Sequence, residues 1–228
     1  MNWKIHHRAE TDSTNLDARA GAHGDVFTAG FQSSGRGRLD HRWLSPPGVN
    51  LLMSAVLDVG GIDPHEVATL PLVVGFAVVK SLPGEIRGER VSLKWPNDVL
   101  VGSRKVAGIL CERHGDNVVA GIGINVKAQD FPPEIAARAA FLGADSVEDV
   151  RDAVLESLGD CYEKWRVAGF SAFHSALSEV DCLRGRVVSV LKTDDDPVPV
   201  EGVCGGITVS GALDVGGEEV YAGEAHVC

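Results

Sequence analysis

The segment Ser34–Trp43 combines three arginines, two glycines and a tryptophan within ten residues. Arg36, Arg38 and Arg42 carry guanidinium groups that form paired hydrogen bonds with carboxylates or phosphates, and glycine lets a backbone approach a ligand closely. Trp43 offers a flat face to a base or another ring. The segment therefore predicts an anion-binding loop, although a solvated basic loop without any ligand has the same composition.

Two segments further along the chain combine polar residues with apolar strands. Lys94, Asn97 and Asp98 surround a proline, a composition that closes a tight turn and could also present polar groups to a ligand. Lys105 precedes the apolar run Val106–Leu110. If its ammonium points inward, it needs an anionic partner, which a ligand could supply; on a strand edge it would simply point to water.

Gly121 and Gly123 lie within another apolar strand segment. Glycine inside a strand marks the close approach of a ligand or of another backbone, or else a bulge. The loop around Arg36 matches neither the GxxxxGK[ST] phosphate-binding loop nor the GxGxxG dinucleotide fingerprint, so neither of these nucleotide-binding classes is predicted.

Two long helices are predicted to support these segments. Apolar residues recur at i+3 and i+4 spacing over residues 147–165, and Ser146 precedes them as an N-cap. An Asp-Pro-x-Glu start predicts a second helix over residues 63–82, which Pro71 should kink or split.

Shorter elements fill the rest of residues 1–180. Ser13 or Thr14 should cap a short helix over residues 11–20. Further predicted elements are strands over 26–31 and 51–57, a loop over 33–50, an antiparallel meander over 91–126 and a helix over 171–177.

The pattern changes after residue 180, where short apolar runs alternate with turns rich in Asp and Gly. We expect a catalytic domain over residues 1–180 and a small β-barrel domain over residues 181–228. The barrel strands are predicted at 187–191, 198–203, 206–209 and 220–227.

Composition excludes several classes of protein. The 228 residues include 21 Lys and Arg against 32 Asp and Glu, a net charge of −11, whereas a general nucleic-acid binder would be basic. The longest apolar stretch, Leu70–Val79, is shorter than the roughly 20 residues that cross a bilayer. The N-terminus lacks an apolar signal core, so we expect a cytoplasmic protein. The five cysteines show no CxxC pair, which predicts mostly buried free thiols and no metal site.

Five motifs occur together in one order: DSTN over 12–15, GRGR over 35–38 with Trp43 behind it, KWPND over 94–98, KVAGIL over 105–110 and GIGIN over 121–125. In this combination the sequence resembles the biotin–protein ligases, which show GRGRxGRxW, KWPND and KxxGIL in the same order. The resemblance runs from about residue 10 to the end. One departure is that the family's Gly-Arg pair in the loop motif reads Asp40-His41 here.

The resemblance implies an α+β fold in which helices flank a mixed or antiparallel central sheet, as in class II synthetases, followed by a small SH3-like β-barrel. It implies an ATP- and Mg²⁺-dependent ligase that converts biotin and ATP to biotinyl-5′-AMP and pyrophosphate. Biotin would then pass to a lysine of a biotin carboxyl carrier protein domain. Since no winged-helix DNA-binding segment precedes the motifs, we expect a ligase that is not a repressor, either monomeric or homodimeric.

The resemblance also assigns roles to individual residues. Lys105, Arg38 and Asp98 match catalytic positions, with Lys105 at the biotin carboxylate and α-phosphate and Asp98 orienting the incoming lysine amine. The ATP-binding positions are matched by Arg38, Trp43, Lys94, Asn97 and Asn125. The biotin-binding positions are matched by Ser13, Thr14, Asn15, Gln32, Gly35, Arg36, Gly37, Arg38, Lys105, Gly108, Leu110, Gly121 and Gly123.

Two other functions stay open at this point. Lipoate ligases and octanoyltransferases share the fold, but their Arg-Arg and glycine-run signature is absent. Cys111, just after KVAGIL, would be an acyl-transfer nucleophile in that group, yet no motif places a histidine to activate it. A non-enzymatic ligand-binding module would bind its ligand without consuming ATP.

Overall fold

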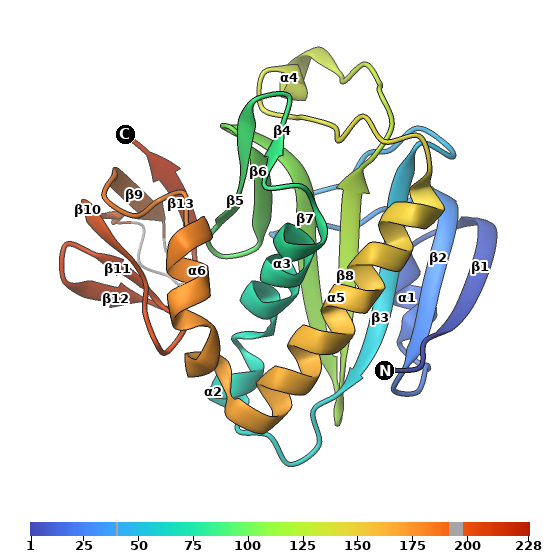
Figure 1. The fold of residues 1–228 in the computed structure, drawn as a ribbon, viewed down its shortest axis with the longest axis horizontal. Helices are drawn as coiled ribbons and strands as arrows, with labels where there is room; N and C mark the ends of the chain where they lie inside the picture. Colours follow the sequence, from blue (N-terminus) through green and yellow to red (C-terminus); the bar gives the residue numbers. More distant parts are fainter. Residues whose placement is uncertain (40, 192–197) are drawn as a thin grey trace.

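The computed structural model describes residues 1–39, 41–191 and 198–228, which form two sheets and their covering helices (Figure 1). The larger sheet has eight strands in the order β1-β2-β3-β8-β7-β6-β5-β4. β1 and β2 run parallel and the other neighbouring pairs run antiparallel, which confirms the predicted α+β class with a mixed sheet. The strands are β1 (Lys4–Thr11), β2 (Asp25–Gln32), β3 (Asn50–Asp58), β4 (Glu85–Ile86), β5 (Glu89–Lys94), β6 (Asp98–Val101), β7 (Arg104–His114) and β8 (Asn117–Asn125).

The predicted meander over residues 91–126 is confirmed as β5, β6, β7 and β8, each paired with the next. The strands predicted at 26–31 and 51–57 are β2 and β3. Within the loop predicted over 33–50, an isolated bridge joins Arg36 and Arg42. Asp40, which stands in the loop motif, lies outside the described residues.

The two faces of the large sheet are covered by different helices. α3 (Leu70–Ser81) and α5 (Val147–Ala168) lie across one face (Figure 1). Successive strand residues point to opposite faces: Ala55 and Leu57 belong to the core under these helices, whereas Val56 packs with Ala18 of α1 (Thr14–Ala18). The helix α1 therefore covers the other face. Residues of β3 that lie an even number of positions from Val56 point to this α1 face.

The long helices begin largely as predicted. The helix predicted over 63–82 is split into α2 (Pro64–Val67) and α3, and the Asp63 side chain accepts a hydrogen bond from the His65 amide at 2.8 Å. Ser146 Oγ accepts from the Asp149 amide at 3.0 Å, which confirms the cap of α5. The helix predicted at 171–177 is a 3₁₀ turn, η1 (Phe170–Phe173), followed by α6 (His174–Val180). A four-residue helix, α4 (Pro133–Ala136), was not predicted.

The predicted side-chain cap of α1 is wrong. Ser13 occupies the N-cap position, but within the described part of the chain its hydroxyl makes no capping hydrogen bond, and Thr14 is already inside the helix. Thr14 instead directs both its amide and its hydroxyl to Gln32 Oε1, at 2.7 Å and 3.0 Å. The polar groups at this helix start are therefore committed to tertiary contacts.

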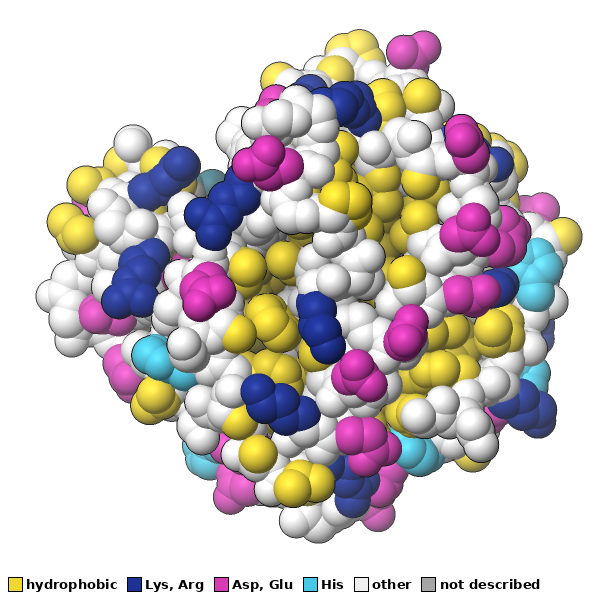
Figure 2. Space-filling view, in the orientation of Figure 1, with side chains coloured by type: hydrophobic (Ala, Val, Ile, Leu, Met, Phe, Trp, Pro, Cys, Tyr) yellow, Lys and Arg dark blue, Asp and Glu magenta, His cyan; other side chains and the backbone are white. Residues whose placement is uncertain are grey.

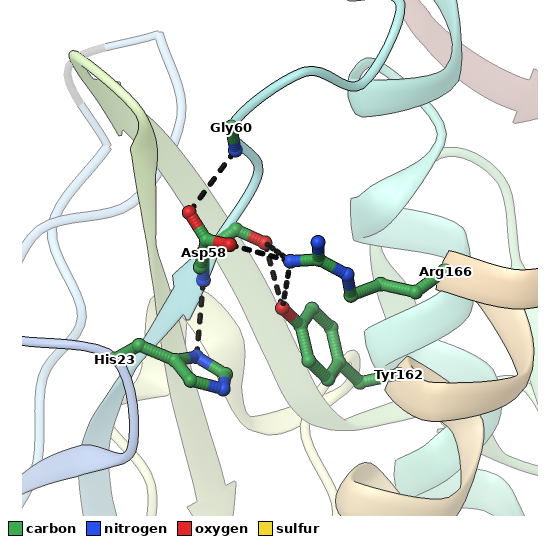
Figure 3. A network of polar contacts seen from close by, with 5 residues as sticks. All are labelled: His23, Asp58, Gly60, Tyr162 and Arg166. Atoms are coloured by element: carbon green, nitrogen blue, oxygen red, sulfur yellow. Dashed lines mark hydrogen bonds and ion pairs between the residues drawn. The ribbon is translucent and has the colours of Figure 1, made fainter.

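A polar network fastens α5 to the end of β3 (Figure 3). Tyr162 donates its hydroxyl to the Asp58 carbonyl at 2.6 Å, and Arg166 Nη1 lies 2.5 Å from Asp58 Oδ2. The hydrogen bond from Arg166, together with one from the Gly60 amide, lowers the pKa of Asp58. On the other side, the Asp58 amide donates to His23 Nδ1 at 3.1 Å.

The C-terminal residues form a five-stranded antiparallel sheet in the order β12-β11-β10-β9-β13. This sheet corresponds to the predicted small β structure, but the edge strands β12 and β13 are not paired with each other, so the described residues form no closed barrel. The strand predicted at 206–209 is wrong in part, because residues 206–207 form the end of β10. The strand predicted at 220–227 is also wrong in part, because its residues are divided between β12 and β13. The strands are β9 (Val187–Leu191), β10 (Val200–Ile207), β11 (Leu213–Val215), β12 (Glu218–Val220) and β13 (Glu224–Val227).

Acidic side chains dominate the outer surface of α5, as Figure 2 shows on the helix-covered face. None of the described helices is long and apolar enough to cross a membrane. The exposed acidic residues of α5 are Glu148, Asp149, Asp152, Glu156, Asp160 and Glu163.

Candidate active site

A cavity of about 140 Å³ opens on the α1 face of the large sheet. Its floor consists of residues that alternate along β8 and β7: Gly121 and Gly123 on one strand pair with Leu110 and Gly108 on the other. Gly121 follows Val119 by two residues, so these positions share the side on which α1 packs. The other described residues that line the cavity include Ser13, Thr14, Asn15, Gln32, Arg36, Gly37, Arg38, Trp43, Asn97, Asp98, Lys105 and Glu224.

A second cavity of about 440 Å³ shares a wall with the first. Trp43, Asn97, Asp98, Lys105 and Glu224 line both cavities. The second cavity also takes in Lys94 and Asn125, two predicted nucleotide-binding residues that are not among the residues lining the first. Of the predicted ATP-side residues, Lys94 and Asn125 thus line only the second cavity, whereas Trp43 and Asn97 line both and Arg38 lines only the first.

One end of the first cavity is built from amide and hydroxyl groups. Ser13, Thr14 and Asn15 are all buried at the start of α1. The buried Ser54 hydroxyl donates to Thr14 Oγ1 at 2.7 Å or to Asn15 Oδ1 at 2.6 Å. Gln32 closes the network by accepting from Thr14. This end presents several buried hydrogen-bonding groups to a ligand.

The strand glycines make room for side chains of the protein itself. A Cβ on Gly121 would lie 2.1 Å from Asn15 Oδ1, and one on Gly123 would lie 2.6 Å from the Trp43 ring. A Cβ on Gly108 would lie 3.1 Å from both the Trp43 ring and Lys105 Nζ. The groups that approach Gly121 and Gly123 closely are the side chains of Asn15 and Trp43, and neither is the backbone that the sequence offered as an alternative to a ligand. Gly35 does not line either cavity; a Cβ there would lie 2.5 Å from the Trp43 carbonyl oxygen.

The other end of the cavity is cationic. Arg38 Nη1 donates to Asn97 Oδ1 at 3.1 Å and to the Gly223 carbonyl at 3.4 Å. Lys105 Nζ lies 2.6 Å from Asp98 Oδ1, so a carboxylate of the chain is the anionic partner that the sequence left undetermined. Arg42 lines the cavity too, but its guanidinium donates to the Ser33 carbonyl at 2.8 Å.

Two amide side chains fix the backbone around the second cavity. Asn97 Nδ2 donates to the Ile109 carbonyl at 2.8 Å, and Asn125 Nδ2 donates to the Ala140 carbonyl at 2.9 Å. The Trp43 indole N–H is buried and has no hydrogen-bond partner among the described residues. A ligand acceptor or a movement of the loop could satisfy this group.

Sequence reasoning missed several residues of this site, among them Ser54, Glu112 and Glu224. Ser54 connects Thr14 and Asn15, and it is the single hydroxyl residue in the otherwise apolar segment 51–57, a signal that could have been noticed. Glu112 contacts both Asn15 and Arg36, but in the sequence it reads as an ordinary charge near a strand end.

The cysteines are free, as predicted, and four of the five are buried or partly buried, Cys228 being the exposed one. Desolvation raises the pKa of the Cys111 thiol to about 12. A thiol with such a pKa is hardly ionised at neutral pH, which argues against Cys111 as an acyl-transfer nucleophile. No group of three His, Cys, Asp or Glu side chains suited to a metal ion occurs in the described ranges.

The cavity thus has buried hydrogen-bonding groups at one end and cationic side chains at the other, and it lies on the mixed sheet of an α+β fold. The chain belongs to the biotin/lipoate A/B protein ligase family, whose profile matches residues 9–128.

Curated relatives are similar over part of their length. The chain is 35% identical over 149 residues to the bifunctional ligase/repressor BirA of Bacillus subtilis, covering 62% of this chain and 45% of that protein. It is 37% identical over 126 residues to the biotin–[acetyl-CoA-carboxylase] ligase of Mycobacterium tuberculosis, covering 52% and 47%. The chain thus spans about half the length of these relatives. The structure of the biotin protein ligase from Aquifex aeolicus in complex with biotin and ATP matches with a TM-score of 0.84 at 30% identity, covering 98% of both chains.

Proposed function

We propose that this chain is a biotin–protein ligase, which activates biotin with ATP and transfers it to a lysine of a biotin carboxyl carrier domain. The observation that carries the proposal is the arrangement of polar groups in one cavity: Thr14 and Asn15, hydrogen-bonded to Ser54 behind them, lie at one end, and Arg38 and Lys105 lie at the other. Biotin has a matching arrangement of groups, because it carries a ureido ring at one end and a carboxylate at the other. The similar Aquifex aeolicus ligase was solved with biotin and ATP, which supports the proposal.

The polar end suits biotin better than lipoate or octanoate. A ureido ring offers two N–H donors and one carbonyl acceptor, which amide and hydroxyl side chains can satisfy. The far ends of octanoyl and lipoyl chains are apolar and offer no N–H donor to the acceptor position that the Asn15 amide oxygen retains beside Ser54.

In the first step, we propose that a biotin carboxylate oxygen attacks the α-phosphorus of ATP, and pyrophosphate leaves with the electron pair of the broken P–O bond. The chain's task is to hold two anions together and to balance the charge that grows at phosphorus. Lys105 and Arg38 are the cations at this end of the cavity. A ligand anion at Lys105 must share or replace Asp98, whose carboxylate lies at 2.6 Å.

In the second step, the carrier lysine amine attacks the carbonyl carbon of biotinyl-5′-AMP, and AMP leaves. The arriving ammonium must lose a proton to solvent before it is nucleophilic, and we assign its attraction and orientation to Asp98. AMP leaves with the electron pair of the broken C–O bond, and the nitrogen releases a second proton to solvent, so the new amide carries no charge. The residues that would hold the biotin portion throughout are Ser13, Thr14, Asn15, Gln32 and the loop residues Arg36, Gly37 and Arg38.

We further propose that Mg²⁺ binds together with ATP. Mg²⁺ keeps several waters and binds through one or two carboxylates plus substrate phosphates, and the carboxylate of Glu224 lines both cavities. This residue fits a metal held chiefly by phosphate, which would neutralise phosphate charge. We further propose a cytoplasmic location and a division into domains at residues 180 and 181.

Biotin-dependent exchange of labelled pyrophosphate into ATP tests the function with purified protein. We expect exchange with biotin and much less with lipoate or octanoate. Exchange that depends on octanoate or lipoate but not on biotin would assign the chain to the other branch of its family. Biotin binding without any exchange would reduce it to a binding module.

A further inference from the structure

Glu112 joins the polar end of the cavity to the arginine-rich loop. It lies on β7, and its Oε2 accepts from Asn15 Nδ2 at 2.7 Å, while its Oε1 accepts from Arg36 Nη1 at 2.9 Å. Arg19 approaches the same Oε1 at 3.7 Å. The carboxylate is only 18% exposed, so these contacts are partly shielded from water. One side chain thus contacts the helix start beneath the cavity and the loop that lines it.

The contact with Glu112 determines which way the Asn15 amide faces. An ionised carboxylate can only accept hydrogen bonds, so the NH₂ group of Asn15 must point toward it. The same NH₂ group donates to the Leu110 carbonyl at 3.3 Å. The amide oxygen is left on the side of Ser54 and Gly121. A carboxamide oxygen accepts two hydrogen bonds, so after Ser54 it retains one position for a ligand N–H.

The contact with Arg36 fixes the first arginine of the loop. Arg36 and Asn15 both line the cavity, and they bind the two oxygens of one carboxylate. Displacing either partner would leave a partly buried carboxylate oxygen without its hydrogen bond, which is costly.

We propose that Glu112 is a positioning residue that holds the Asn15 amide with its oxygen toward the ureido N–H groups of biotin and couples this orientation to Arg36. The proposal rests on the proposed biotin ligase function. It predicts an effect on biotin affinity that is transmitted through Asn15, with little effect on turnover once biotin is saturating.

The test measures biotin affinity by calorimetry and both KM for biotin and kcat by pyrophosphate exchange. Glu112→Ala should weaken biotin binding about tenfold or more, the scale of a lost hydrogen bond to a charged group, with kcat within about a factor of two. Glu112→Gln keeps an acceptor oxygen for Asn15 but loses the ion pair with Arg36, so it should recover a large part of the affinity. Thermal unfolding of each variant shows whether it is folded, and Glu112→Leu, which also removes both acceptor oxygens, carries the test if Glu112→Ala is not.

A double-mutant cycle separates positioning from general structure. In Asn15→Ala, the further change Glu112→Ala should have little additional effect on biotin affinity, because its partner is gone. Glu89→Gln is the matched control, because Glu89 is another sheet carboxylate paired with an arginine, at 3.3 Å from Arg104, and it is not among the described residues that line either cavity.

The outcomes distinguish the two proposals. A wild-type protein that fails to bind biotin overturns the proposed function and this inference with it. Wild-type binding with unchanged affinity in both Glu112 variants, or effects of Glu112 and Asn15 that simply add, overturns the role of Glu112 alone.

Discussion

Lys105 Nζ lies 2.6 Å from Asp98 Oδ1, so the lysine proposed to act in adenylation and the aspartate proposed to act in transfer form an ion pair between β7 and β6. The register of these strands shifts between Val99 and Leu100, which sets Leu100 opposite Lys105 and Asp98 opposite Gly108. Both side chains are partly exposed, at 38% and 22%. A ligand anion that binds at Lys105 must therefore compete with a carboxylate that is already there.

Lys105→Ala should abolish most adenylation while the protein stays folded. A cation that stabilises charge mainly in the transition state is worth about 3–4 kcal/mol, or roughly 100- to 1,000-fold in rate. The measurement is biotin-dependent pyrophosphate exchange, with circular dichroism as the folding control. Near-normal exchange by a folded variant would remove Lys105 from the mechanism.

Asp98→Asn should slow transfer to the carrier domain and leave biotinyl-5′-AMP synthesis nearly intact. The amide keeps a turn-compatible residue but lacks the charge that attracts an ammonium. It also frees Lys105, so the first step has no reason to suffer. Single-turnover measurement of each step decides the matter. If adenylation proved to be the slower half-reaction in the variant, Asp98 would belong to the ATP side of the site.

Arg38→Gly should release biotinyl-5′-AMP early. Arg38 ties the loop to Asn97 and to the Gly223 carbonyl, and the variant loses both contacts together with a cation in the cavity. Free adenylate in solution, and labelling of lysines on an unrelated protein, would report the release. We also expect biotinyl-5′-AMP to protect the wild-type loop, roughly residues 34–44, from proteolysis. Equal cleavage with and without the adenylate would count against loop closure.

Two glycine variants should separate the two ends of the site. Gly121→Ala places a Cβ against Asn15 and Gly123→Ala places one against Trp43, and overpacking of this kind typically costs about 1–3 kcal/mol. We expect the first to weaken biotin binding and the second to weaken ATP binding in the presence of biotin. Calorimetric titration with each ligand is the measurement. The opposite pattern would reassign Trp43 to the biotin side.

The network of Asp58 with Tyr162 and Arg166 should make stability depend on acid pH. Because the folded pKa of Asp58 is lowered, its contribution to the free energy of unfolding is present above the unfolded pKa and is lost as the pH falls through the folded value. Asp58→Asn should lower stability at pH 7 by no more than about 1 kcal/mol, since the pair is partly exposed to solvent. Urea unfolding at pH 7 and pH 3 checks this, and a loss that is equally large at both pH values would contradict it.

The elements with strong hydrophobic patterns could be predicted from the sequence. The helix α5 has both an i+3 and i+4 apolar stripe and a serine cap, and β5 to β8 are apolar runs separated by turn residues. The strand β1 has no such pattern, because most of its side chains are exposed and it is held mainly by parallel pairing with β2. The three-residue strands β11 and β12 are too short to give a periodicity.

The residues of the candidate site also include some that the sequence could predict and some that it could not. Glycines and arginines that fall in compact motifs could be singled out as candidates. The contact of Glu112 with Asn15 joins residues 97 positions apart and exists only because α1 packs on this face of the sheet, which a single sequence does not reveal. The ion pair of Lys105 with Asp98 depends on a register shift.

The exposure of Cys228 gives the protein a natural attachment point for a spectroscopic probe. It directly follows β13, whose first residue, Glu224, lines both cavities, while the other four thiols are buried or partly buried. A thiol-reactive fluorophore would therefore label the C-terminal sheet selectively under mild conditions. Its emission would follow ligand arrival in real time, without any substitution in the site.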